Sequence, residues 1–582
     1  MRLTGRRLFK RGKFMKMQRW VALGLIFICS SAFAGTFTTT DTLIPVSLNA
    51  VGTASGDTSD TGKAIIHVDA RVYIPDGVAT PAPVIVIVAP YGGDKDSGLV
   101  IDLAHDFASN GYVVLTPTPR GMGNSEGLVS LAGPTEINDL KTMIVAMQNG
   151  TIGDTPAVPV PVSSLSKFGV TGASYGGGQT FEIMRTHVQG LAAVAPIIGW
   201  TDLYQALSPN DVPKFSYILG LFASGYDPQN PNYEDQMFDK LSQFLRGQPE
   251  DTRTGDTNSV DWRSVIFNPT ELTVPVFAIQ GWRDWLFPAE QAISLFQAST
   301  NIPFFKLYLG GLGHAPAQSD LTSPEALFLR SQLLRWFDHW LKGVANGIDT
   351  EPRVTVAPAH TSDWSQGALI TSNTFPLPNT STTSYSFNGS TLSTTGPGGQ
   401  ATSIAATGFF GPSVLSPILS ANDAAALLLA VSSANSAINN GTDVLGPDIF
   451  TDVDNDAESK GFTSAALGSD LKVIGTPRVN LSVSSRGRNA YYFAQLLEKL
   501  PDGTLHLVSR GAIKDKSTGF RKAHSISFPL FSINHTFAAG NAMKLRISTR
   551  DFPFFLPNLD ERTVKVFHNS KHPSSIDLPV VP

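Results

Sequence analysis

The sequence of 582 residues predicts an α/β domain with a mostly parallel sheet, followed by an all-β domain. Up to about residue 348, apolar strand-like segments alternate with amphipathic helical segments, which is the pattern of parallel sheets. Between about 200 and 270, aromatic residues, prolines and short amphipathic stretches replace this alternation and indicate an inserted helical cap. From about 349, short alternating segments separated by Gly, Asn, Pro and Ser predict a sandwich or jelly roll.

Each element of the first domain has its own signal. The β-branched run at 83–89 predicts a strand that is buried on both faces, and the alternation at 65–73 predicts a partly exposed strand. A glycine after residue 110 is typical of a helix end. Further strands are expected at 112–115, 168–171, 191–198, 274–279 and 304–309, and helices at 101–110, 135–148, 179–188 and 324–342.

The second domain, expected over 349–582, has clear alternation at 479–483 and 544–548. An Ala/Ser/Asn-rich tract at 395–455 interrupts it and is predicted to be an ordered insertion or a mobile loop. At 452–456 the sequence begins like a calcium loop, but Ala457 and Thr463 stand where the loop requires glycine and glutamate. We therefore expect a solvated acidic turn there, and neither a metal site nor a cofactor in the chain.

The first 34 residues have the pattern of a secretory signal peptide. Eight basic residues and no acidic one precede an apolar run at 20–34, which ends in Ala32-Phe33-Ala34. This run is shorter than the roughly 20 residues that span a bilayer. We expect cleavage after Ala34 and export to the periplasm or the medium, with no membrane attachment afterwards.

Removal of this segment would also take away the single cysteine, Cys29, and with it any disulfide or thiol chemistry. The formal net charge would change from −5 to −13, because the segment holds eight basic residues. Such an acidic chain argues against nucleic acid as a partner.

The pentapeptide Gly172-Ala173-Ser174-Tyr175-Gly176 has the form G-x-S-x-G and lies between an expected strand and an expected helix. A serine on such a sharp strand-to-helix turn needs small neighbours, as in the nucleophile elbow of α/β-hydrolases. The pattern alone is weak in a chain rich in glycine and serine, so the catalytic partners must be found elsewhere.

Two loops supply the partners in the expected order. Asp284 follows the strand expected at 274–279, and His314 lies in a glycine-rich loop after the strand expected at 304–309. A serine needs a histidine to accept its proton and a carboxylate to orient that histidine. His339 is a weaker candidate, because it lies within an amphipathic helix. The sequence therefore predicts a triad of Ser174, Asp284 and His314.

A tetrahedral oxyanion needs two donors. The backbone N–H of Tyr175, directly after the serine, is one by geometry. The second is expected from residues 90–93, which follow the strand at 83–89.

Several motifs appear in the order found in one known family: Pro90-Tyr91, 120–127, Ser174 to Gly177, Gly281 to Asp284, and 335–343. Together with 475–479 and 548–553, they resemble the X-prolyl dipeptidyl-peptidase and cocaine-esterase group of α/β-hydrolases over about residues 60–575. The resemblance implies that the second domain is a jelly roll and that the Tyr91 hydroxyl completes the oxyanion hole. Arg120 is expected to brace loop ends.

Two departures from the family pattern concern the substrate pocket. Gly177 and Gly178 stand where bulkier or acidic residues are common, which predicts an open pocket wall, and Leu312-Gly313 replaces the usual tryptophan-serine pair. The β domain is expected to cover one side of the cleft.

We predict a serine hydrolase acting on a small ester or short peptide, with an acyl esterase as the first choice. An X-Pro dipeptidyl aminopeptidase is the alternative, for which Asp202 or Glu182 would have to anchor the substrate amine. A non-catalytic binding module on a hydrolase scaffold is the alternative from another class.

Overall fold

The computed structural model describes residues 35–47, 65–227, 232–253, 259–314, 322–359, 368–406, 459–486, 489–517, 522–551, 554–558 and 562–582. By its contacts the chain divides into Met1–Ala34 and Gly35–Pro582. The expected signal peptide, the acidic segment 452–456 and most of the tract 395–455 lie outside the described residues. In the part that is described, no helix combines the length and apolar character needed to cross a membrane.

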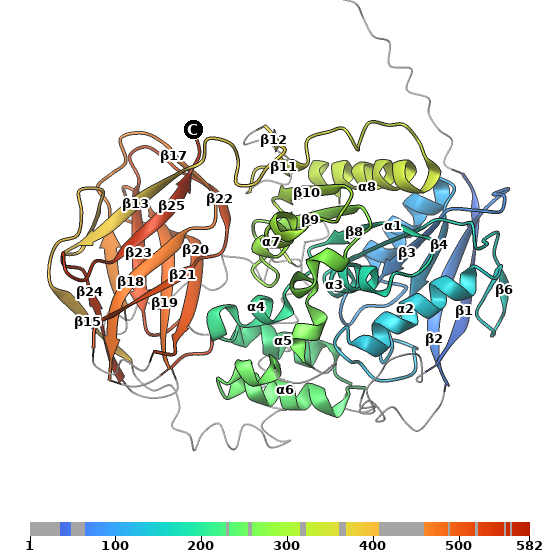
Figure 1. The fold of residues 1–582 in the computed structure, drawn as a ribbon, viewed down its shortest axis with the longest axis horizontal. Coiled ribbons are helices and arrows are strands. Elements are labelled where there is room, and N and C mark those ends of the chain that lie inside the picture. Colours follow the sequence, from blue (N-terminus) through green and yellow to red (C-terminus); the bar gives the residue numbers. More distant parts are fainter. Residues whose placement is uncertain are drawn as a thin grey trace, which may run out of the picture. The chain divides into compact units, whose positions relative to one another are not determined.

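A ten-stranded sheet forms the first part of this unit (Figure 1). Its inner strands are parallel and are connected by helices, because a parallel pair needs a long crossover between its ends. The strands lie in the order β1 (Phe37–Ser47), β2 (Ile65–Pro75), β4 (Val113–Pro117), β3 (Val84–Val88), β7 (Phe168–Ala173), β8 (Leu191–Ile197), β9 (Val276–Gly281), β10 (Phe305–Gly310), β11 (Val354–Val356) and β12 (Ile370–Ser372).

Both faces of this sheet are buried, which explains the continuous apolar run of β3. Val84 and Val86 belong to a core shared with the helices α2 and α7, whereas Ile85 and Ile87 belong to a core shared with α1 and α8. Alternate residues of a strand point to opposite faces, so both sets must be apolar. The covering helices are α1 (Gly98–Ser109), α2 (Pro134–Met147), α7 (Glu290–Ala298) and α8 (Pro324–Lys342).

Between β8 and β9 the chain forms the predicted cap. Short helices follow one another there with no strand among the described residues, and three of them begin with a proline: Pro209, Pro249 and Pro269. The cap consists of α4 (Leu203–Leu207), η2 (Pro209–Asp211), α5 (Phe215–Gly225), α6 (Asp235–Leu245), η3 (Pro249–Arg253), η4 (Val260–Arg263), η5 (Val265–Phe267) and η6 (Pro269–Glu271).

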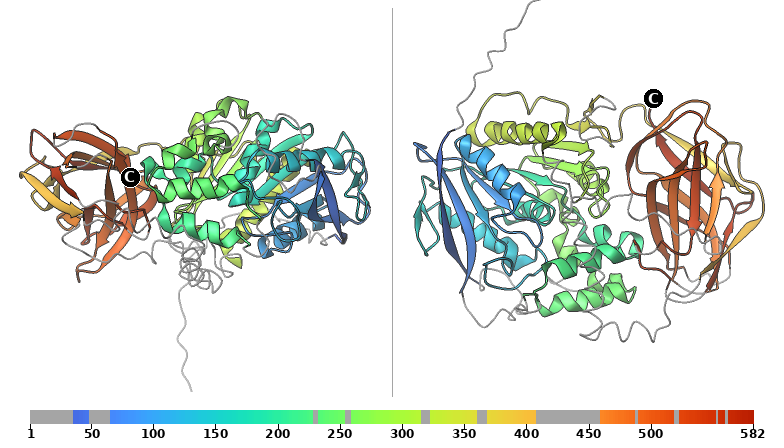
Figure 2. Two further views of the ribbon diagram at one scale, coloured as in Figure 1. Left: turned by 90° about the horizontal axis from the view of Figure 1, so that it is seen from below. Right: turned by 180° about the vertical axis from the view of Figure 1, so that it is seen from behind.

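The C-terminal part consists of strands around one hydrophobic core, with no helix among its described residues (Figures 1 and 2). Alternation places one face of each strand in this core, as in β18, where Val479, Leu481 and Val483 are buried. The strands are β13 (Ser381–Asn388), β14 (Thr391–Ser393), β15 (Ala401–Ala406), β16 (Ser459–Thr463), β17 (Leu471–Gly475), β18 (Arg478–Ser485), β19 (Ala490–Lys499), β20 (Leu505–Asp515), β21 (His524–Pro529), β22 (Ile533–Phe537), β23 (Ala542–Ser548), β24 (Arg562–Phe567) and β25 (Ser575–Val580).

Some details differ from the sequence expectations. The threonine-rich segment before residue 48 is a strand, β1, and it pairs along its whole length with β2. Residues 290–298 form the helix α7, which was not expected from the sequence pattern. Beyond residue 349, where helical periodicity fades, β11 pairs with β10 and β12 pairs with β11, so both strands still extend the first sheet.

Candidate active site

Ser174 lies on the turn between β7 and α3 (Tyr175–Glu182), with a positive φ of 58° that L-residues rarely adopt. The turn is tight because it packs against the backbone of β3. A Cβ at Gly172 would lie 2.6 Å from the carbonyl oxygen of Val88, and one at Gly176 would collide with the same atom. Glycine is therefore required on both sides of the serine, as the tight turn of a nucleophile elbow demands.

The three residues predicted as a triad form one hydrogen-bonded chain. Ser174 Oγ lies 2.8 Å from Nε2 of His314, and His314 Nδ1 lies 2.9 Å from Oδ2 of Asp284. Asp284 is fully buried and the His314 side chain is 7% exposed. The imidazole and the Phe287 ring pack edge-to-face, with ring centroids 4.9 Å apart. This arrangement can transfer the serine proton to the histidine and stabilise the resulting imidazolium.

The loops that carry Asp284 and His314 hold each other in place. The N–H of Trp282 donates to Gly310, and that of Arg283 donates to Leu312. A Cβ at Gly281 would collide with the carbonyl of Leu312, so only glycine permits this approach.

Within the first of these loops, the Asp284 carboxylate is held by the backbone that follows it. Its Oδ1 accepts the N–H groups of Leu286 and Phe287 at 3.0 and 2.8 Å. The other oxygen, Oδ2, is the one beside the His314 ring. The hydrogen bonds therefore define which oxygen serves the histidine.

Tyr91 follows β3 and packs edge-on against Tyr175, with ring centroids 5.1 Å apart. Its hydroxyl donates to the hydroxyl of Tyr233 at 2.5 Å, and Tyr233 donates to the carbonyl of Phe222 in the cap. Burial raises the pKa of Tyr91 well above its ordinary value, so the hydroxyl stays protonated as a donor. Tyr233 is a neighbour that sequence reasoning missed, because nothing near it in the chain marks it.

A buried carboxylate, Glu136, lies behind the elbow. It accepts the Tyr175 hydroxyl at 2.6 Å, the Ser130 N–H at 2.6 Å and the Gln179 side chain at 3.2 Å. Burial raises the pKa of Glu136, and the Tyr175 and Ser130 hydrogen bonds oppose that rise. The Tyr175 ring, and with it the start of α3, is thereby fixed by a residue that the sequence did not single out.

Arg120 has the expected bracing role. Its guanidinium donates two hydrogen bonds, of 2.7 and 2.8 Å, to the carboxylate of Asp139 on α2, and both side chains are buried. Neither residue lines the cavity beside Ser174.

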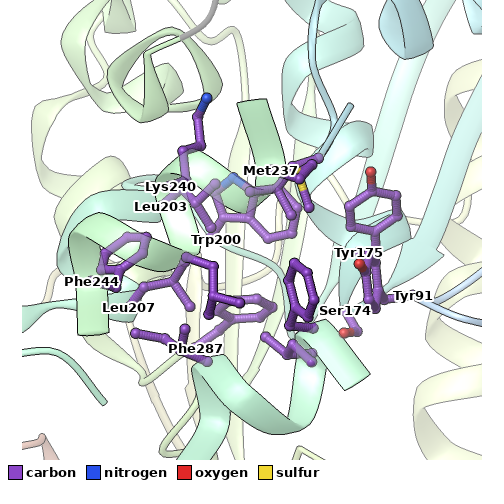
Figure 3. Close-up of a pocket in the computed structure, with 15 residues that line it drawn as sticks. Tyr91, Ser174, Tyr175, Trp200, Leu203, Leu207, Met237, Lys240, Phe244 and Phe287 are labelled. Carbon is purple, nitrogen blue, oxygen red and sulfur yellow. The ribbon is translucent and has the colours of Figure 1, made fainter. Parts of the chain in front are cut away.

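That cavity is open to solvent, with about 650 Å³ of empty space including its mouth, and its lining is almost entirely apolar. Ser174 lies at its edge beside Tyr91, and the cap supplies most of the opposite wall (Figure 3). The ammonium end of Lys240 points away from the other labelled side chains in Figure 3, so the stem of this residue forms the wall. The remaining lining residues are Leu131, Tyr175, Trp200, Leu203, Leu207, Ile218, Leu221, Phe222, Met237, Leu241, Phe244 and Phe287.

Two expectations about this cavity were wrong. Gly177 and Gly178 do not leave its wall open, because the Trp200 ring packs directly on Gly178 and a Cβ at Gly177 would lie 2.5 Å from the Ile197 carbonyl oxygen. In the described part of the chain, all the lining residues lie between 91 and 287, so the described strands of the β domain supply none of them. Its contact with the site is through the Asp284 loop instead, because Trp285 packs on Phe531 and Phe554 of the β domain.

Comparison with known families agrees with this geometry. Residues 62–316 match the family described as X-Pro dipeptidyl-peptidase (S15 family), and residues 346–576 match the X-Pro dipeptidyl-peptidase C-terminal non-catalytic domain. The chain belongs to the X-Pro dipeptidyl-peptidase and cocaine-esterase group of α/β-hydrolases. The predicted fold class, an α/β-hydrolase domain followed by a β domain, is confirmed.

Individual relatives are distant. A Bacillus anthracis protein named as an Xaa-Pro dipeptidyl-peptidase is 28% identical over 262 residues, which are 43% of this chain and 42% of that protein. The chain thus spans less than half of that relative's length. The cocaine esterase of Rhodococcus sp. (strain MB1 Bresler) is 20% identical over 598 residues, 88% of this chain and 95% of that protein. A CocE/NonD family hydrolase from Staphylococcus aureus shares the fold, with a TM-score of 0.65, 14% identity and coverage of 94% and 97% of the two chains.

Proposed function

We propose that this chain is a serine hydrolase that cleaves esters of apolar acyl groups through an acyl-enzyme. The observation that carries the proposal is the hydrogen-bonded chain Ser174–His314–Asp284 at the edge of an apolar cavity. Membership in a family of peptidases and esterases supports it.

In the proposed reaction, Ser174 attacks the carbonyl carbon while Nε2 of His314 takes its proton. The Tyr175 N–H and the Tyr91 hydroxyl stabilise the oxyanion. The imidazolium returns the proton to the leaving alcohol, which leaves the acyl group on the serine. A water, deprotonated by the same histidine, then releases the acid, and Asp284 orients the ring throughout.

The apolar cavity favours esterase over dipeptidyl-peptidase activity. An X-Pro dipeptide presents a free ammonium group, which loses its hydration on burial and needs an acidic partner. Among the described residues that line the cavity there is no aspartate or glutamate. Of the two conceivable anchors, Asp202 accepts the N–H of Gln205 as a helix cap, and Glu182 pairs with Arg185 at 2.9 Å. Neither faces the cavity, so an acyl chain is the better occupant.

Two assays test these proposals. A fluorophosphonate probe should label the wild type and should leave Ser174→Ala unlabelled; an unlabelled wild type would favour a binding module on a hydrolase scaffold. Hydrolysis of p-nitrophenyl butyrate should exceed that of a Gly-Pro anilide, and the reverse preference would establish the dipeptidyl-peptidase alternative.

We also propose that the chain is exported and cleaved after Ala34, on the signal-peptide pattern of residues 1–34. Cell fractionation with N-terminal sequencing tests this, and a cytoplasmic product that retains these residues would contradict it.

A further inference from the structure

Lys214 is a fully buried lysine beside the loop that carries Asp284. It directly precedes α5 of the cap, and its Nζ donates to the carbonyls of Trp285 and Leu286 at 2.6 and 3.0 Å. The ammonium also lies 4.7 Å from the ring centroid of Phe531 in the β domain. A buried ammonium is costly to desolvate, so such a site calls for a physical explanation.

The explanation lies in the two peptide groups that Lys214 contacts. The Trp285 carbonyl and the Leu286 N–H belong to one planar peptide unit, and the Leu286 carbonyl and the Phe287 N–H belong to the next. Both N–H groups donate to Oδ1 of Asp284. Each peptide group therefore bonds to the ammonium at one end and to the catalytic carboxylate at the other.

In such a chain of hydrogen bonds, polarisation passes from the ammonium through the peptide groups to the carboxylate. An ammonium on a carbonyl polarises the peptide group and strengthens the hydrogen bond that its N–H donates. The carboxylates whose charges act on Lys214 are Asp284 and Glu290. Burial lowers the pKa of Lys214 to about 7, and these two carboxylates oppose the fall.

We propose that Lys214 is a positioning residue for Asp284, which acts through these two peptide groups to aim Oδ2 at the histidine. This inference rests on the proposed serine-hydrolase function. Lys214 does not line the cavity, so its loss should affect turnover and leave substrate binding unchanged.

The test compares Lys214→Met with a matched control, Lys514→Met. Lys514 is also buried and also links the β domain to the cap, through hydrogen bonds to the Gly247 carbonyl and to Glu250. Both of these partners belong to the cap and neither to the Asp284 loop, so Lys514→Met reports the loss of a buried lysine at the same junction.

We expect Lys214→Met to lower kcat for p-nitrophenyl butyrate by about 10- to 100-fold, with KM changed less than about twofold. The far-downfield proton resonance of His314 Nδ1–H should weaken or move upfield. Lys514→Met should lose stability and keep kcat and that resonance. Lys214→Gln, which retains a neutral donor, is the second variant if the methionine does not fold, and its kcat should fall less.

Wild-type kcat in a folded Lys214→Met or Lys214→Gln protein would overturn the inference, as would an equal loss of kcat in Lys514→Met. Fluorophosphonate labelling of the wild type keeps this outcome separate from failure of the proposed function. If the wild type is labelled and Lys214→Met keeps full turnover, the positioning role is refuted while the proposed serine-hydrolase function stands.

Discussion

Replacement of Tyr91 by phenylalanine tests the oxyanion hole with the least disturbance of the fold. The change deletes one oxygen and preserves the ring contact with Tyr175. In the structure this hydroxyl gives its single proton to Tyr233. During the reaction, the Tyr91 hydroxyl must therefore turn from Tyr233 to the oxyanion.

The expected magnitude follows from these two hydrogen bonds. Loss of one oxyanion donor raises the barrier by about 2.7–4 kcal/mol. In the intact enzyme, the Tyr91 hydroxyl must break its hydrogen bond to Tyr233, which reduces its stabilisation of the oxyanion by about 1 kcal/mol. The net loss is about 2–3 kcal/mol, so kcat for p-nitrophenyl butyrate in Tyr91→Phe should fall roughly 30- to 150-fold.

Tyr233→Phe is the matched control, because it removes the competing acceptor and leaves the proposed donor. Its kcat should stay the same or rise by up to about fivefold, the equivalent of about 1 kcal/mol. Thermal unfolding should show that both variants are folded. Unchanged turnover in Tyr91→Phe, at unchanged fluorophosphonate labelling, would show that Tyr91 only packs against the elbow.

Three further predictions concern stability and are measured by urea unfolding. Gly169→Ala should destabilise by about 1–3 kcal/mol, because the added Cβ would lie 2.5 Å from the Phe337 ring, and Phe337→Leu should restore part of the loss. Tyr175→Phe should cost about 1.5–3 kcal/mol through the lost hydrogen bond to the carboxylate behind the elbow. Burial raises the pKa of Glu498, but hydrogen bonds, the largest from His535, lower it by more than burial raises it, so the pKa is about 2. Glu498→Gln should thus be less stable than the wild type above about pH 4.5, with the difference vanishing as pH falls towards 2.

Much of the candidate site could be predicted because its signals are local. Ser174 is marked by its neighbours, and Asp284 and His314 each follow a strand with an unmistakable apolar run. In a parallel sheet such loops share one edge, so the chain order is enough to bring them together. The structure adds the distances that join them.

The rest of the site depends on contacts between distant parts of the chain. Glu136 lies 39 residues before Tyr175, and Lys214 lies 71 residues before Trp285. Nothing near either residue predicts that it is buried, and most lysines and glutamates are exposed. Trp200 closes the pocket wall that was expected to be open, because its ring packs on Gly178. The spacing of the glycines in the sequence does not reveal this contact.

Trp285 also bears on how freely the two domains could be exchanged between relatives. The residue directly after Asp284 packs on Phe554, and Arg510 of the β domain stacks over the indole at 5.0 Å. The Asp284 loop would lose this support in a chain truncated before the β domain. The same loss is expected in a chain joined to the β domain of a relative that lacks these side chains. The two parts are therefore expected to be inherited and engineered as a pair.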